Sequence, residues 1–252
     1  PTVYGVGFLP TDTTTRTVDD KLITVYHYQV KSIRLTFKGF SGTLPALSIS
    51  ELEELDLKFN NITGGIPAFD FPKCKTLNFM GNQLSGNIPA MDYPELITLN
   101  LAQNQFSGTI PNFNLPKLHI LFLQDNTLGG SVPAFNLPEL ESLYASNNNL
   151  SGDIPVMQVP NLKNLQLENN QLTGTLQPLT PLTKLEYILL TNNQLGGEIP
   201  NFNMPDLVNL ALGDNNLTGA IPSFNMPRLL LLNLKNNHVS GEFNNSGLPE
   251  LR

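Results

Sequence analysis

The sequence predicts a solenoid of stacked coils that carries a parallel β-sheet along one face. Two observations lead to this prediction. The first is a phrase, Leu-x-Leu-x-x-Asn-x-Leu-x-Gly-x-Ile-Pro, that recurs along the chain and is clearest at residues 99–111. The second is its spacing of 22 residues, with a single step of 23, which is read most easily from its asparagines: Asn60, Asn82, Asn104, Asn126, Asn148, Asn170, Asn193, Asn215 and Asn237. A fixed period of about 20–29 residues is typical of repeat proteins, in which each coil buries its apolar face only against its neighbours.

Each element of the repeat has a physical role. Leu-x-Leu predicts a short strand whose leucines point inward, because side chains alternate along a strand. The asparagine follows the strand, where its carboxamide can accept from one backbone N–H and donate to a neighbouring carbonyl. We therefore expect Asn126→Ala to lower the free energy of unfolding by roughly 1–3 kcal/mol, because it leaves backbone groups unpaired. An earlier copy of the repeat spans residues 33–45, with Lys38 in the place of the asparagine.

The segment after each Ile-Pro is expected to form the convex side of the coil, opposite the sheet. Prolines recur five residues apart around a phenylalanine, as at Pro133 and Pro138. This spacing disfavours a helix, so we expect an irregular or polyproline-like convex face with few helices. One copy, at 176–185, has an extra residue and predicts a local bulge. The recurring phenylalanines are expected to form a second row of the core: Phe69, Phe113, Phe135, Phe202 and Phe224.

The two ends of the chain differ from the repeats. Residues 1–30 hold two β-prone runs that flank a turn-rich stretch of threonine and aspartate at 10–20, which predicts an N-terminal β-rich cap. Residues 31–252 form the predicted solenoid of about ten repeats. Its last residues, 248–251, match the start of another coil, so we expect a C-terminal end that is uncapped or truncated and that continues or is covered. Such an end would expose the edges of three leucines: Leu229, Leu232 and Leu234.

Composition narrows the functional classes. The chain has 252 residues, a net charge of −7 and a pI near 4.9, which argue against nucleic acid or an anionic membrane surface as a partner. No run of 18 apolar residues is present, so no segment is expected to insert into a membrane. The single cysteine, Cys74, takes the place of a repeat leucine and is expected to be a buried small hydrophobe.

The consensus Leu-x-x-Leu-x-Leu-x-x-Asn-x-Leu-(Ser/Thr/Gly)-Gly-x-Ile-Pro resembles plant-type leucine-rich repeats over residues 30–251. Such repeats occur in plant receptor-kinase ectodomains and in inhibitors of fungal polygalacturonase. The resemblance implies a curved right-handed horseshoe with a parallel β-sheet on its concave face. It also implies extracellular recognition of a protein, peptide or glycan, without catalysis and without a cofactor. Two departures from those ectodomains are the shorter repeat of 22 residues and the lack of a cysteine pair. The shortened form with Phe-Asn-Leu-Pro is more similar to repeat proteins of bacterial or protist surfaces.

Outward-pointing residues of the predicted strands are mostly small and polar, with one exception. The exception spans four consecutive coils, and we call it the aromatic patch: Ile120, Phe122, Tyr144, Gln166, Tyr187 and Leu189. Polar side chains surround it at Gln124, Ser142, Asn164 and Glu168. Neighbouring strands are ~4.8 Å apart, so the patch would be roughly 15 Å long and is a candidate ligand-binding site. The alternative is that these side chains only pack against one another across the strands.

Other candidate sites are few. Four Asn-x-Ser/Thr motifs are glycosylation sites if the protein is secreted by a eukaryote: Asn61, Asn149, Asn216 and Asn244. The chain has no nucleophile motif, phosphate-binding glycine loop or metal-ligand spacing, so neither an enzyme nor a metal site is expected. The leading interpretation is a secreted or cell-surface recognition and adhesion module. The alternative is a structural surface protein that self-associates into a filament or layer, because the low charge, the similar coils and the open end could support packing of copies.

Overall fold

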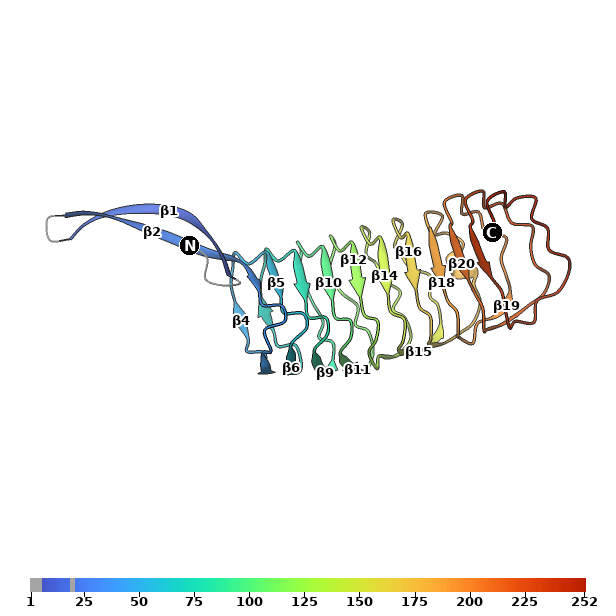
Figure 1. Ribbon diagram of the computed structural model, residues 1–252, viewed down its shortest axis with the longest axis horizontal. Coiled ribbons are helices and arrows are strands. Elements are labelled where there is room, and N and C mark those ends of the chain that lie inside the picture. The colour runs from blue at the N-terminus through green and yellow to red at the C-terminus, as the bar shows by residue number, and fades with distance from the viewer. Residues whose placement is uncertain (1–5, 19–20) are drawn as a thin grey trace.

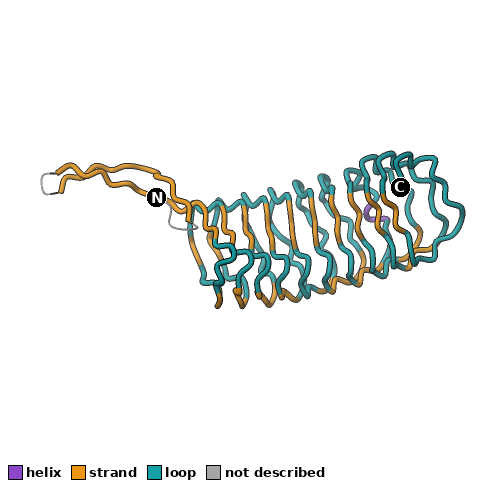
Figure 2. Tube along the Cα trace, viewed as in Figure 1, coloured by secondary structure: helices purple, strands orange, loops and turns teal. Residues whose placement is uncertain are grey.

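The computed structural model describes residues 6–18 and 21–252, with side chains from residue 29 onward. Coils are stacked side by side along the long axis of the molecule, and a β-hairpin precedes them (Figure 1). Strands and loops make up the coils almost entirely (Figure 2). The predicted solenoid is therefore confirmed.

In the part of the chain that the structure describes, eleven strands form one long sheet whose order follows the chain. From β2 onward, neighbouring strands are parallel and pair at equivalent repeat positions, as Leu99 does with Leu121 and Ile120 with Ser142. Each repeat position therefore becomes a column across the sheet. We call the solvent-facing side of this sheet, which is the predicted concave side, the sheet face. The strands are β1 (Val6–Val18), β2 (Lys21–Arg34), β5 (Glu54–Asp56), β8 (Thr76–Asn78), β10 (Thr98–Asn100), β12 (Ile120–Phe122), β14 (Ser142–Tyr144), β16 (Asn164–Gln166), β18 (Tyr187–Leu189), β20 (Asn209–Ala211) and β22 (Leu231–Asn233).

Among the described residues, shorter strands form four smaller sheets elsewhere in the coils. They are β3 (Ser41–Thr43), β6 (Asn61–Gly64), β9 (Gln83–Asn87) and β11 (Gln105–Ser107); β13 (Gly129–Gly130), β15 (Asn149–Asp153) and β17 (Gln171–Thr173); β19 (Gly196–Glu198) and β21 (Asn216–Thr218); and β4 (Leu47–Ser48) and β7 (Phe69–Asp70). Within the described ranges the only helix is the 3₁₀ turn η1 (Gln177–Leu179), which lies in the irregular copy of the repeat. The prediction of few helices is confirmed, and the expected bulge takes the form of this turn.

Close packing between coils requires a glycine at some of the turns in or after these shorter strands. Gly108 follows β11 and has a φ of +71°, a conformation that other residues rarely adopt. A Cβ atom at Gly108 would also lie only 2.3 Å from Oδ1 of Asn87 in the preceding coil. Gly108 is therefore required both by the backbone conformation of the turn and by the close spacing of neighbouring coils.

The core lies inside the coils, behind the long sheet. The strand leucines are fully buried, for example Leu77, Leu99 and Leu121. Cys74 is fully buried in a leucine position, as predicted, and burial raises the pKa of its thiol to about 12. The predicted second core row is confirmed, with four buried phenylalanines and a partly buried fifth: Phe113, Phe135, Phe202, Phe224 and Phe69.

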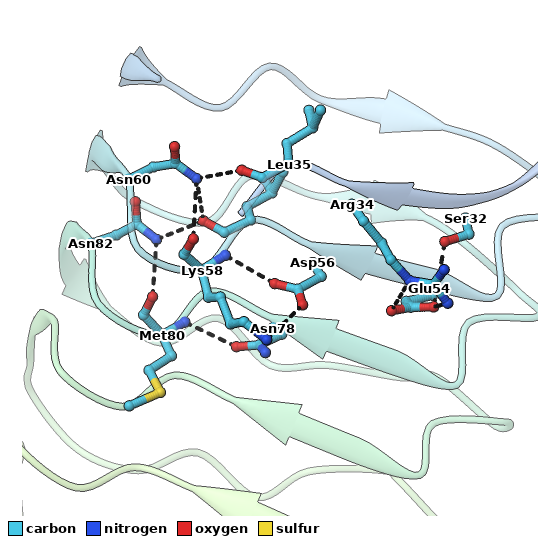
Figure 3. A network of polar contacts seen from close by, with 11 residues as sticks. Ser32, Arg34, Leu35, Glu54, Asp56, Lys58, Asn60, Asn78, Met80 and Asn82 are labelled. Carbon is cyan, nitrogen blue, oxygen red and sulfur yellow. Dashed lines mark hydrogen bonds and ion pairs between the residues drawn. The ribbon is translucent and has the colours of Figure 1, made fainter. Parts of the chain in front are cut away.

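The repeated asparagines form the predicted ladder between coils. Oδ1 of Asn148 accepts from the backbone N–H of Leu128 in the preceding coil at 2.9 Å. Nδ2 of Asn148 donates to the carbonyl of Leu123 in the preceding coil at 3.0 Å and to that of Ala145 in its own coil at 3.2 Å. Figure 3 shows the same kind of donation from Asn60 near the start of the solenoid. One buried carboxamide therefore pairs backbone groups of two coils at once.

The N-terminal hairpin consists of β1 and β2, which pair as antiparallel strands. In Figure 1 it extends from the first coil along the long axis, and the end of β2 pairs with β5. Residues 10–18, expected to be a turn region, belong to β1 instead, because they pair with β2 as an antiparallel strand. Part of the first β-prone run, residues 1–5, lies outside the described residues. Whether this segment acts as a cap stays a prediction.

The two ends of the core differ. At the first coil a cavity of about 290 Å³ is lined mostly by apolar side chains, among them Leu35 and Phe40. At the last coil Leu229 is fully buried, so the expectation that its edge is exposed was wrong. Leu248, in the segment that follows, is buried in the same core cluster. Leu232 and Leu234 are only partly buried.

Candidate functional site

The parallel register places the six residues of the aromatic patch on four neighbouring strands. Phe122 of β12 pairs with Tyr144 of β14, and Gln166 of β16 pairs with Leu189 of β18. Ile120 and Tyr187 stand at the ends of the parallel column that runs from β12 to β18. All six side chains are partly exposed. The patch predicted from the sequence is therefore contiguous, although its role as a binding site remains a prediction.

The centre of the patch is a stacked pair of rings. The centroids of Phe122 and Tyr144 lie 4.8 Å apart, and the two planes are inclined by 7°. This separation matches the ~4.8 Å between neighbouring strands, so the rings stack because the register aligns them. Stacked aromatic pairs present a wide apolar surface at low cost in side-chain entropy, which suits contact with a ligand.

Two of the surrounding polar groups pair with each other. Nδ2 of Asn164 donates to Oγ of Ser142 at 3.0 Å, and Ser142 is buried. This hydrogen bond lies in the column between Ile120 and Tyr187. The bonded polar groups therefore lie between the side chains of Ile120 and Tyr187.

A third column borders the patch, and it consists of Gln124, Ser146 and Glu168. The parallel ladder continues through it, because Asp125 N–H donates to the Ser146 carbonyl at 3.0 Å and Asn147 N–H donates to the Glu168 carbonyl at 2.9 Å. The three side chains therefore lie on successive coils, spaced by ~4.8 Å. Gln124 and Glu168 were predicted beside the patch, whereas Ser146 was not singled out among the predicted site residues. Its position two residues after Tyr144 is the signal that would have found it.

This third column contains polar atoms that are not paired. Oε1 of Gln124 and Oγ of Ser146 are shielded from solvent, and neither has a hydrogen-bond partner among the described residues. Burial also raises the pKa of the Glu168 carboxyl above its ordinary value. No other group contributes to that shift, so desolvation alone is its cause.

The remaining predicted positions are placed as follows. The glycosylation candidates Asn61, Asn149 and Asn216 each begin a short strand of the smaller sheets, and Asn244 lies near the C-terminal end. All four are exposed. Within the described ranges, no cluster of histidine, cysteine, aspartate or glutamate is suited to hold a metal ion. No helix of the described chain is long and apolar enough to span a bilayer.

The comparisons with known proteins agree with this geometry. The family Leucine Rich Repeat matches three stretches of the chain, residues 51–70, 95–114 and 139–157. No curated protein matches the sequence significantly. The chain is a leucine-rich repeat solenoid, as the consensus of its sequence predicted.

Solved structures place the fold among receptor ectodomains and related repeat proteins. The Arabidopsis receptor kinase HAESA, solved with the peptide hormone IDA and the co-receptor SERK1, is 28% identical with a TM-score of 0.73, over 84% of this chain and 38% of that one. PEPR1, solved with AtPEP1, is 27% identical with a TM-score of 0.65, over 84% and 39%. YopM from Yersinia enterocolitica is 26% identical with a TM-score of 0.65, over 81% and 44%. This chain therefore spans less than half the length of these proteins.

Proposed function

We propose that the protein is a non-catalytic recognition module that binds an extended peptide segment of an extracellular or cell-surface partner. The aromatic patch on the sheet face is the proposed binding site. The observation that carries this proposal is the stacked, partly exposed pair of Phe122 and Tyr144. Tyrosine and other large aromatic residues are enriched among the residues that dominate binding energy.

The surroundings of the rings support a peptide ligand. Strands at ~4.8 Å spacing offer regularly placed side chains across the sheet, and an extended peptide presents its own at regular intervals of about 3.3 Å per residue on alternating faces. Amide and hydroxyl groups at Gln166, Gln124 and Ser146 border the rings and can exchange hydrogen bonds with a peptide backbone. The receptor kinase HAESA, to which the chain is similar, is described in complex with a peptide hormone.

Selection from a library of displayed random peptides tests the proposal. We expect the wild-type chain to enrich a family of peptides, and the double variant Phe122→Ala with Tyr144→Ala to lose their binding in calorimetry. A double variant at Arg34→Ala and Glu54→Ala, on the same face near the N-terminal hairpin, is the matched control and should retain binding. Peptides that bind both variants equally would contradict the proposed site.

Two further results would favour the other interpretations. Binding of a glycan array through the patch, with no peptide selected, would replace the peptide by a sugar ligand. Sedimentation velocity that shows growing assemblies with rising protein concentration, equally in wild type and patch variant, would favour the self-associating structural protein. A monomer that binds peptides through Phe122 and Tyr144 is the outcome expected here.

A further inference from the structure

The third column beside the patch differs from the rest of the sheet face because its polar groups lack partners. Native proteins pair nearly all of their buried polar atoms, so each exception requires a reason. Two neighbouring exceptions, Oε1 of Gln124 and Oγ of Ser146, occur on adjacent coils. Each such atom lowers the stability of the fold, because it has lost its hydrogen bonds to water without gaining others. Both side chains can rotate between staggered conformers, so both oxygens can turn toward a group that approaches the sheet face.

Glu168 extends this column and adds a charge. It is half-buried, and its carboxylate has neither an ion pair nor a hydrogen bond among the side chains that the structure describes. The next cation in the same column, Lys235, is three coils away, or about 14 Å at the usual strand spacing. A half-buried carboxylate without a partner is unfavourable, and a bound cation would relieve that penalty.

Carboxylates elsewhere on the sheet face are paired within the chain. Nε of Arg34 donates to Oε1 of Glu54 at 2.7 Å, and Nζ of Lys58 lies 3.2 Å from Oδ2 of Asp56 (Figure 3). The column of Gln124, Ser146 and Glu168 thus presents hydrogen-bond acceptors that the fold does not use. Three adjacent acceptors match the donors of an ammonium or guanidinium group, which has no acceptor of its own.

We propose that Gln124, Ser146 and Glu168 bind the basic side chain of a lysine or arginine in the peptide that lies on the aromatic patch. This inference rests on the proposed function and specifies the class of ligand. Tyr144 is a diagonal neighbour of Glu168 at about 7–8 Å, close enough for its ring to contact the aliphatic stem of the same basic side chain. The net charge of −7 also favours the approach of a basic ligand.

The test uses the same displayed peptide library and three single variants of the full chain. Wild type is expected to enrich peptides with lysine or arginine at a constant distance from an apolar or aromatic residue. In a synthetic peptide from this family, norleucine then replaces the basic residue, because it keeps the aliphatic stem and removes the charge. We expect this replacement to weaken binding to wild type about tenfold, as for one charge-assisted hydrogen bond.

The variant Glu168→Gln closes a double-mutant cycle. It should bind the lysine peptide about tenfold more weakly than wild type does, and should bind the norleucine peptide with unchanged affinity. Glu198→Gln removes an exposed carboxylate from β19, outside the long sheet, and should leave both affinities unchanged. Thermal unfolding of each variant confirms that the fold is intact.

The outcomes separate this inference from the function on which it rests. Peptides that lose binding in Phe122→Ala but show no preference for a basic residue would overturn the inference and leave the proposed function standing. Equal effects of norleucine in wild type and in Glu168→Gln would also overturn it. Failure to select any peptide that depends on Phe122 would overturn both.

Discussion

Two stretches of the same sheet face use the same backbone for different chemistry. Near the N-terminal hairpin, β2 and β5 carry Arg34 and Glu54, which pair with each other across the strands. In the middle of the solenoid, β12 and β14 carry Phe122 and Tyr144 at equivalent repeat positions. The first stretch satisfies its charges internally, whereas the second presents rings to solvent beside polar atoms without partners.

This difference is possible because stability comes from elsewhere in the coil. Asn60 beneath the first stretch and Asn148 beneath the second make the same hydrogen bonds to two coils. Leucines at identical positions fill the core in both. Since neither the core nor the ladder depends on the outward side chains, the sheet face can vary from coil to coil. Polar groups on the sheet face that already pair within the chain are less available to a ligand than groups without a partner.

The largest expected effect is on ligand affinity, which should depend on the second stretch and not on the first. Phe122→Ala should weaken binding of a selected peptide by about 30-fold or more, because a central aromatic residue in an interface typically contributes about 2 kcal/mol or more. Arg34→Ala should change the affinity by less than about threefold, since surface substitutions away from a site have small effects. Calorimetry on both variants measures this contrast. Equal losses would mean that the ligand covers the whole face.

The second expected effect, the loss of stability when a ladder asparagine is replaced, should be the same in both stretches. Asn148→Ala and Asn60→Ala should each lower the free energy of unfolding by about 1–3 kcal/mol, because each leaves several buried backbone groups unpaired. Chemical denaturation measures the loss. The exposed neighbours Asn149 and Asn61 provide matched controls, and their alanine variants should stay within about 0.5 kcal/mol of wild type. A melt of Asn148→Ala like that of wild type would contradict the role of the ladder.

The response to acid should have opposite signs in the two stretches. Hydrogen bonds from Lys31 and Lys75 lower the pKa of Glu53 to about 2, so its stabilising contribution is present at neutral pH. That contribution is lost as the pH falls from the ordinary glutamate value toward 2. Burial raises the pKa of Glu168, so its ionised form is destabilising, and the penalty is removed as it becomes protonated.

Two glutamine variants test this difference in denaturation curves taken at decreasing pH. Glu53→Gln should flatten the acid-side loss of stability. Glu168→Gln should raise stability near neutral pH and make the acid-side loss steeper than in wild type. Parallel pH profiles for the two variants would show that the two carboxyl groups do not differ in this way.

The smallest effect concerns the ion pair of the first stretch. Arg34→Ala should lower the free energy of unfolding by less than about 1 kcal/mol, because Arg34 is exposed and surface ion pairs contribute little. The loss should shrink further in high salt, which screens exposed charges. Denaturation at low and high ionic strength measures it. A loss as large as that of Asn60→Ala would mean that this pair is part of the structural framework.

Much of this architecture could be predicted because the repeat period translates directly into register. Equal spacing of the asparagines means that equivalent residues stand side by side on neighbouring coils. The ladder at Asn148, the buried phenylalanine row and the adjacency of Phe122 and Tyr144 all follow from this spacing. The burial of Cys74 follows from its place in a leucine position. The repeat pattern was sufficient to predict these features because equivalent residues occupy equivalent places in successive coils.

The predictions failed where the pattern stops. Residues 10–18 extend the first strand of the hairpin, because pairing with β2 outweighs their turn-like composition. Leu229 is buried, because the residues after the last repeat fold onto the core with Leu248. In the irregular copy the sequence predicted a bulge but not its form, the turn η1. Each of these outcomes depends on contacts that the repeat period does not encode.

The sequence by itself determined the solenoid, its columns and the position of the aromatic patch, because side-chain alternation and a constant period leave one consistent register. Only the tertiary structure decided which polar groups on the sheet face have partners. Arg34 reaches Glu54 in the next coil, whereas Gln124, Ser146 and Glu168 find no partner in theirs. Such pairings depend on the rotamers and burial of side chains on neighbouring coils, and therefore on how the coils pack.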